Sequence, residues 1–185
     1  MHAIICHGTM GSPAGNWFPW LSTQLIENGI PTYVPTLPSP QNHSLRSWLA
    51  AFNQQCPPID QQTILIGHSL GAALCMRILE KLEHPVKATV LVSPPLGQIG
   101  MPEIDTLNSS FLDHPFNWSA IRANAGELSY FMGDDDQYVP QEQLLTIARE
   151  LQVQPMVIRG AGHLNSETGY TRFPELLAEL RRIAI

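Results

Sequence analysis

The chain has 185 residues, of which 44% are hydrophobic and 14% are charged. This length fits one domain, residues 1–185, which can bury about 70% of the surface of its unfolded chain. The net charge is −6 and no cluster of Lys and Arg is present to follow a phosphate backbone, so we do not expect a nucleic-acid partner. No apolar stretch approaches the roughly 18 residues of a membrane helix, and no basic segment precedes an apolar one at the start of the chain. We therefore expect a cytoplasmic protein without a membrane partner.

Short apolar runs alternate with amphipathic segments along the chain. The runs that we predict as strands are Ala3–Cys6, Thr32–Val34, Thr63–Ile66, Ala88–Val92, Leu128–Met132 and Pro155–Ile158. They are continuously apolar rather than alternating, which is typical of strands covered on both faces in a parallel sheet.

Helical patterns separate these runs. One predicted helix carries Trp17 to Ile26, is capped by Asn16 and ends at Gly29; the others begin at Ser44 or Ser47, or span Leu70–Leu82, Gln141–Leu151 and Phe173–Ile183. The alternation predicts an α/β fold, a doubly wound and mostly parallel sheet of about six strands with helices on both faces. Ligand chemistry is then expected beyond the carboxyl ends of the strands.

The connection Gly97–Glu127 is much longer than is usual between a strand and the next strand. We predict that it forms a small partial cover over the site. Candidate walls of a substrate pocket are the apolar side chains of Trp17, Trp20, Leu96, Phe116 and Trp118, although each of them is explained equally well as part of the core.

The segment Gly67–Gly71 (GHSLG) matches the pattern G-x-S-x-G and lies between the predicted strand Thr63–Ile66 and a predicted helix. An abrupt turn from strand to helix strains the middle residue and brings its glycine neighbours so close to other elements that a Cβ would clash. The turn places Ser69 at the amino end of a helix, where free N–H groups favour negative charge. We therefore predict that Ser69 is a nucleophile and that the N–H of Leu70 is one oxyanion donor; an ordinary serine in a Gly-rich turn is the alternative.

A second Gly-rich segment, His7–Gly11 (HGTMG), follows the first predicted strand. Loops at this place supply the second oxyanion donor in hydrolases with such a serine turn, and glycines let the backbone approach the substrate. Thr9 and Met10 are both candidates for this donor. A phosphate-binding loop is disfavoured because no G-x-x-x-x-G-K-[ST] pattern is present.

A serine hydroxyl needs a base to remove its proton, and the expected chain order is serine, acid, histidine. His163 follows the strand Pro155–Ile158 in a Gly-rich loop, whereas His114 follows no strand. We therefore predict His163 as the base. The acid is expected after the strand Leu128–Met132, where Asp136 or Asp135 can fill the role.

Three adjacent aspartates in that loop also raise the possibility of a metal site. Neighbouring carboxylates cannot all converge on one ion without other ligands, and the D-x-D-x-D-G spacing of a calcium loop is absent. We predict no metal ion and no cofactor. Two of the three aspartates are expected to be solvated or to cap the following helix.

These motifs resemble those of a family of small serine hydrolases typified by retinoblastoma-binding protein 9. The likeness spans nearly the whole chain and includes the Gly-rich loop with Trp17-x-x-Trp20, ILIGHSL at Ile64–Leu70, the strand Val90–Ser93, the aromatic segment His114–Asn124, Gly133-x-x-Asp136-x-x-Val139-Pro140 and Gly162-His163. The resemblance implies a minimal α/β-hydrolase fold with no large lid domain. It also implies Ser69, Asp136 and His163 as nucleophile, acid and base, and the choice of Asp136 over Asp135 depends mainly on it.

The resemblance implies serine hydrolase or carboxylesterase-type activity. It does not imply binding of a retinoblastoma-type pocket protein, because the L-x-C-x-E motif of the human family member has no counterpart around Cys56. We therefore expect hydrolysis of a small ester or related acyl substrate through a Ser-His-Asp triad and an acyl-enzyme. Thioesterase or aminopeptidase-like activity uses the same residues. The alternative of a different class is a non-catalytic protein-interaction module, against which the retention of all three triad residue types argues.

Overall fold

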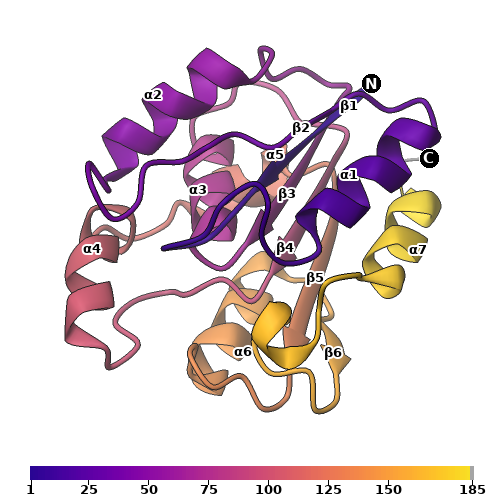
Figure 1. The fold of residues 1–185 in the computed structure, drawn as a ribbon. Coiled ribbons are helices and arrows are strands. Elements are labelled where there is room, and N and C mark those ends of the chain that lie inside the picture. The colour runs from indigo at the N-terminus through magenta and orange to yellow at the C-terminus, as the bar shows by residue number, and fades with distance from the viewer. Residues whose placement is uncertain (184–185) are drawn as a thin grey trace.

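The computed structural model describes residues 1–183, which are built around one six-stranded sheet (Figure 1). Its strands are β1 (His2–Cys6), β2 (Thr32–Tyr33), β3 (Thr63–His68), β4 (Ala88–Val92), β5 (Glu127–Gly133) and β6 (Met156–Ile158). The strand order is β2-β1-β3-β4-β5-β6, and every neighbouring pair is parallel. Since the order reverses at β1 and β3, the loops after these two strands meet at the crevice where a doubly wound sheet binds ligands.

Helices cover both faces of the sheet. On one face α1 (Phe18–Glu27) and α7 (Pro174–Ile183) lie side by side and share a core cluster with Ile5, Ile66 and Val90 (Figure 1). The opposite face carries α2 (Leu45–Gln55), α3 (Leu70–Leu79), α4 (Pro102–Leu112), α5 (Trp118–Asn124) and α6 (Gln141–Leu151). The predicted α/β fold is confirmed. Among the helices of residues 1–183, none has both the length and the apolar character needed to cross a bilayer, and the cytoplasmic location stays a prediction.

The structure decides the start of α2, for which two serines were candidates, and changes the predicted start of α1. Ser44 caps α2, since its hydroxyl accepts the N–H of Ser47 at 3.2 Å. The predicted cap at Asn16 is wrong, because the residue at the cap position of α1 is Trp17 and the helix begins at Phe18. Asn16 instead takes a left-handed backbone, φ 48°, and its side chain accepts the N–H of Ser166 at 3.0 Å. A partner distant in the chain has replaced the local capping role.

The connection Gly97–Glu127 contains two helices, α4 and α5, that the sequence pattern did not reveal. α4 starts with Pro102 at its first turn, a position where proline costs no hydrogen bond, and Glu103 and Asp105 follow near the positive end of the helix dipole. Only Asn108 and Phe111 of this helix are buried. With so few buried positions the helical pattern is weak, which is why no helix was predicted within this connection.

Arg77 on α3 anchors this connection from inside the protein. Its guanidinium donates to the backbone carbonyls of Phe111 and His114, to a third carbonyl at Pro115, and to the Glu80 carboxylate. It also stacks over the Phe116 ring at 3.7 Å from the centroid. Since the side chain is only 8% exposed, these partners replace nearly all of its water. One planar side chain therefore holds the α4–α5 segment against the helix that follows Ser69.

We predict that R77M lowers the free energy of unfolding by about 2–4 kcal/mol, because methionine keeps the apolar stem but leaves the three carbonyls without this donor and the Glu80 carboxylate without its counter-ion. Urea denaturation followed by circular dichroism measures the change. R181M, at an exposed arginine on α7, is the matched control and is expected to change stability by less than about 0.5 kcal/mol. Equal losses in the two variants would contradict an anchoring role for Arg77.

Candidate active site

Ser69 lies in the sharp turn between β3 and α3. Its backbone has φ 55° and ψ −128°, a conformation that a non-glycine residue holds only when its surroundings enforce it. A Cβ on Gly71 would lie 2.2 Å from the carbonyl oxygen of Cys6, and one on Gly67 would lie 2.5 Å from a backbone atom of α3. The Ser69 N–H donates to the carbonyl of Val92 on β4 at 2.8 Å. The turn thus has the backbone predicted from G-x-S-x-G.

Asp136 and His163 lie on the loops that follow the neighbouring strands β5 and β6. Asp136 Oδ2 and His163 Nδ1 are 2.8 Å apart, and the side chains are 0% and 7% exposed. The second carboxylate oxygen of Asp136 accepts the N–H groups of Tyr138 and Val139, each at 2.9 Å. Burial alone raises the pKa of Asp136, but the hydrogen bond and charge of His163 together with these N–H groups lower it overall. The ionised carboxylate places the imidazole proton on Nδ1 and leaves Nε2 as the basic nitrogen.

The other two aspartates of this loop hold the backbone of the loop that carries His163. Asp134 accepts the N–H of Gly160 at 2.8 Å, and Asp135 accepts the N–H of Gly162 at 2.7 Å. Both residues are exposed in the loop, as expected for solvated aspartates, and neither caps α6. In addition they bind the neighbouring loop, because the two loops lie against each other across the β5–β6 pair. Each carboxylate points to a different partner. Within residues 1–183 no group of three or more His, Cys, Asp or Glu is arranged to hold a metal ion.

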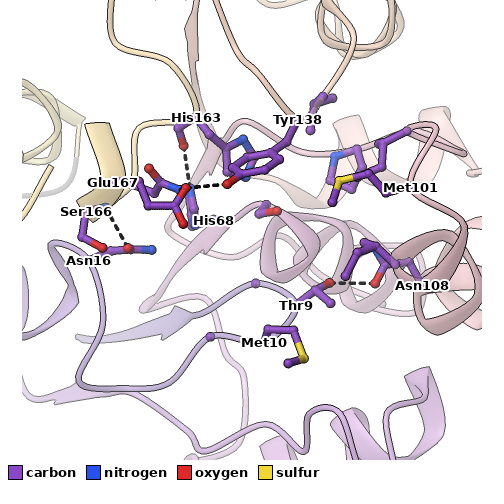
Figure 2. A pocket seen from close by; sticks show the side chains of 18 residues that line it. Thr9, Met10, Asn16, His68, Met101, Asn108, Tyr138, His163, Ser166 and Glu167 are labelled. Atoms are coloured by element: carbon purple, nitrogen blue, oxygen red, sulfur yellow. Dashed lines mark hydrogen bonds between the residues drawn. The ribbon is translucent and has the colours of Figure 1, made fainter. Parts of the chain in front are cut away.

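A pocket of about 360 Å³ opens at the carboxyl edge of the sheet, and Ser69 and His163 both line it (Figure 2). In the described part of the chain no hydrogen bond joins the Ser69 hydroxyl to the His163 imidazole; such bonds are often long in unliganded hydrolases and tighten with substrate. The remaining walls come from the Gly-rich loop, from the segment that includes α4, and from the loops around Asp136 and His163.

Backbone N–H groups face the nucleophile from two sides. Leu70 is the first residue of α3, where an N–H has no partner inside its own helix. On the Gly-rich loop the N–H of Met10 donates to Ser39 Oγ at 3.0 Å, whereas the N–H of Thr9 meets no acceptor within residues 1–183. A Cβ on Gly8 would lie 2.8 Å from Ser69 Cβ, so this loop runs directly past the serine. Of the two candidates, Thr9 has the N–H that is available to a ligand.

Two buried histidines support these loops. His68 lies next to Ser69, and its Nε2 is 2.9 Å from the carbonyl oxygen of His163 (Figure 2). Burial, and then the nearby His163, lower the pKa of His68 to about 3, so the ring is neutral and donates this bond. His7 accepts the N–H of Leu37 on Nε2 at 3.1 Å and has Nδ1 2.9 Å from the carbonyl of Gly8; burial lowers its pKa too. Neutral rings thus connect the serine turn and the Gly-rich loop to their neighbours.

The model of the family described as serine hydrolase matches residues 3–182. The chain belongs to the serine hydrolase family. Among curated relatives it is similar to putative hydrolase YdeN of Bacillus subtilis (strain 168), with 27% identity over 172 residues covering 92% of this chain and 89% of YdeN. It is also similar to serine hydrolase RBBP9 of Rattus norvegicus, with 28% identity over 178 residues covering 95% and 91% of the two chains. The resemblance inferred from the motifs is therefore confirmed.

Solved structures agree with this family assignment. The structure of the Bacillus subtilis ydeN product matches with a TM-score of 0.89 and 26% identity, covering 98% of this chain and 97% of that one. A carboxylesterase from the thaumarchaeon Nitrososphaera gargenis matches with a TM-score of 0.71 at 11% identity, covering 98% and 90%. At that identity the second match shows a shared fold alone.

The predicted pocket residues Trp17 and Trp20 do not line the pocket of this serine hydrolase. Trp17 is completely buried in the cluster beneath α1, and its indole N–H donates to the carbonyl of Leu164 at 3.0 Å. Trp20 packs against the same cluster. The Trp17 ring lies 6.0 Å from the His68 ring, so it packs beneath the site and forms none of the pocket wall.

Leu96, Phe116 and Trp118, also predicted for the pocket, lie elsewhere as well. They line a separate hollow of about 350 Å³ with residues of α6. Arg77 stacks on Phe116 and holds this segment beside α3, away from Ser69. The prediction was wrong for Phe116 and Trp118 because one buried cation decides where their segment lies. It was wrong for Leu96 because the N–H of this residue donates to Gln143 of α6 at 2.9 Å, which holds it at the same hollow.

Other residues form the walls instead, and sequence reasoning missed them. Asn108 of α4 accepts the hydroxyl of Thr9 at 2.7 Å and so joins the cover to the Gly-rich loop (Figure 2). Tyr138 and Glu167 lie close in sequence to Asp136 and His163, a signal that would have found them. The residues of α4 gave no such signal, because the helix itself was not recognised.

We predict that H68Q makes stability less dependent on pH. Below about pH 6.5 the unfolded chain binds a proton on His68 that the native ring, with a pKa of about 3, does not bind, so this group makes stability fall as pH falls. Between pH 7 and pH 5 the unfolding free energy of the wild type is expected to drop by about 2 kcal/mol more than that of H68Q.

Urea denaturation at several pH values measures this difference. Glutamine keeps an N–H donor for the carbonyl of His163, and the other buried histidines are present in both proteins, so the difference isolates His68. Parallel pH curves for the two proteins would show that His68 is not the source of the dependence.

Proposed function

We propose that this member of the serine hydrolase family is a carboxylesterase-like enzyme that hydrolyses small acyl esters through Ser69, His163 and Asp136. The observation that carries the proposal is the buried Asp136–His163 hydrogen bond of 2.8 Å beside a pocket that also contains the strained Ser69 turn. A strained serine conformation costs stability, so a fold that keeps it beside a buried Asp–His pair on one pocket favours a catalytic use. The match in fold to a carboxylesterase is consistent with it.

In the proposed reaction Ser69 Oγ attacks the ester carbonyl carbon while His163 Nε2 takes the hydroxyl proton. The N–H groups of Leu70 and Thr9 stabilise the negative charge on the carbonyl oxygen. His163 then gives its proton to the departing alkoxide, and the acyl group stays on Ser69. Water, activated by the same imidazole, attacks this acyl-enzyme and restores the serine. Asp136 remains ionised throughout and stabilises the imidazolium.

The pocket suits a small substrate. Its volume of about 360 Å³ lies at the lower end of the range for small-molecule sites. We further propose that the partner is a small acyl compound in the cytoplasm rather than a nucleic acid or a membrane. Thioesters and amides would meet the same three residues, and a non-catalytic interaction module is separated from the enzyme by the first test below.

We predict that a fluorophosphonate probe labels the wild-type protein and not S69A. In the same assay series S69A and H163A are expected to lower kcat for p-nitrophenyl esters by at least about 10³-fold, because each removes a group that acts in the transition state. Gel fluorescence measures labelling, and thermal unfolding confirms that the variants are folded. Undiminished labelling of S69A would refute the nucleophile, while a folded wild type that is never labelled would favour the interaction module.

We predict that D136N and D135N differ sharply in activity. Asparagine at 136 favours the wrong tautomer of His163 and is expected to reduce kcat by about 10³- to 10⁴-fold. Asparagine at 135 keeps an oxygen that accepts the N–H of Gly162, so its kcat should stay within about tenfold of the wild type. Steady-state kinetics with one p-nitrophenyl ester compare the two variants. The opposite ranking would assign the acid to Asp135.

A further inference from the structure

The pocket has two unlike walls on either side of the reacting groups. One wall is apolar and is built by Ile99, Met101 and Ile104 from the segment at the start of α4. The other is polar and consists of the Asn165–Glu167 segment, with Tyr138 beside it. Figure 2 shows Met101 on one side and Ser166 and Glu167 on the other. An ester that fits both walls has one apolar part and one polar part.

Glu167 is held in a defined position on the polar wall. It lies in η1 (Ser166–Thr168), a single turn of 3-10 helix whose start is closed by a capping box at Asn165. Its Oε2 accepts the hydroxyl of Tyr138 at 2.5 Å and lies 3.4 Å from the Asn165 amide nitrogen. The other oxygen, Oε1, accepts no hydrogen bond from residues 1–183. One carboxylate oxygen is therefore fixed while the second is available to a ligand.

The pocket carries a negative charge, from the carboxylate of Glu167. Its lining residues within 1–183 include Glu167 but no Lys, Arg or Asp. None of the ion pairs of the described chain uses Glu167 either. Glu167 is exposed at the mouth of the pocket, so salt screens its charge. At low salt a carboxylate without a counter-ion attracts a cationic group and repels an anionic one.

The position of Glu167 relative to His163 indicates which part of an ester would contact it. The leaving oxygen must lie at His163 Nε2, because that nitrogen protonates it. Tyr138 packs edge-on against the His163 ring, with centroids 5.2 Å apart and an interplanar angle of 83°, and its hydroxyl leads directly to Glu167. A group attached to the leaving oxygen therefore extends toward Tyr138 and Glu167, and the acyl chain toward Ile99 and Ile104.

We propose that Glu167, oriented by Tyr138, is a leaving-group subsite that selects esters whose alcohol part carries an ammonium group and whose acyl part is apolar. This inference rests on the proposed esterase function and adds a substrate class to it. The carboxylate stabilises the cation in the ground state and in the transition state alike, so its contribution appears in kcat/KM.

The test uses three butanoate esters. Choline butanoate and 3,3-dimethylbutyl butanoate have nearly the same shape and differ in the positive charge of the alcohol part; p-nitrophenyl butanoate reports turnover without a cation. For the wild type we expect kcat/KM for the choline ester to exceed that for its neutral isostere by about tenfold at low salt, and the ratio to fall as salt screens the carboxylate.

E167Q keeps an oxygen for the Tyr138 hydroxyl but removes the charge, and is expected to bring this ratio close to one through loss of activity on the choline ester. E83Q is the matched control. It makes the same substitution at an exposed residue just before β4, at the opposite end of the sheet, and should retain the wild-type ratio.

The outcomes separate the two levels of the proposal. A wild-type ratio of one or less, or an equal ratio in the wild type and E167Q, overturns the subsite while turnover of the p-nitrophenyl ester leaves the esterase function standing. Absence of turnover for all three esters, together with absence of fluorophosphonate labelling, overturns both.

Discussion

The close approach of Gly71 to the carbonyl of Cys6 is the contact on which the rest of the site depends. It lets α3 start directly against the end of β1, with the strained Ser69 between them and the Gly-rich loop running past at Gly8. A side chain at position 71 would need space already occupied by backbone, which cannot move without separating β1 from β3. The serine, the free N–H at the start of α3 and the loop of Thr9 are thus positioned together by one packing constraint.

A second constraint joins the loops after β5 and β6. Three consecutive aspartates face the Gly160–His163 loop, and only Asp136 reaches the imidazole ring. His68, at the end of β3, donates to the carbonyl of His163. The base is therefore held both by the loop after β5 and by the residue that precedes Ser69. Because its buried ring stays neutral, this support adds no competing charge beside the Asp136–His163 pair.

The cover over the pocket follows from the helix behind the serine. Arg77 on α3 binds one carbonyl in the last turn of α4 and two in the segment between α4 and α5, and these bonds fix where α4 lies. At its other end α4 is joined through Asn108 to Thr9. The same helix that begins at the nucleophile therefore sets the apolar wall of the pocket, although the residues of that wall come from a distant part of the chain. The polar wall is set independently, by the turn that follows His163.

The sequence by itself determined the six strands, the doubly wound sheet, the turn at Ser69 and the loops that carry Asp136 and His163. These features depend on contiguous residues, namely apolar runs, glycines that permit close backbone contact, and polar residues placed directly after strands. Only the tertiary structure decided which oxygen or nitrogen each loop residue meets, as with the three aspartates and the N–H groups of Thr9 and Met10. It also decided the pocket walls, where Trp17, Trp20, Leu96, Phe116 and Trp118 were expected and α4, Tyr138 and Glu167 are found. The physical reason is that a buried cation, Arg77, and the packing of α1 orient those aromatic side chains, and neither effect is local in the chain.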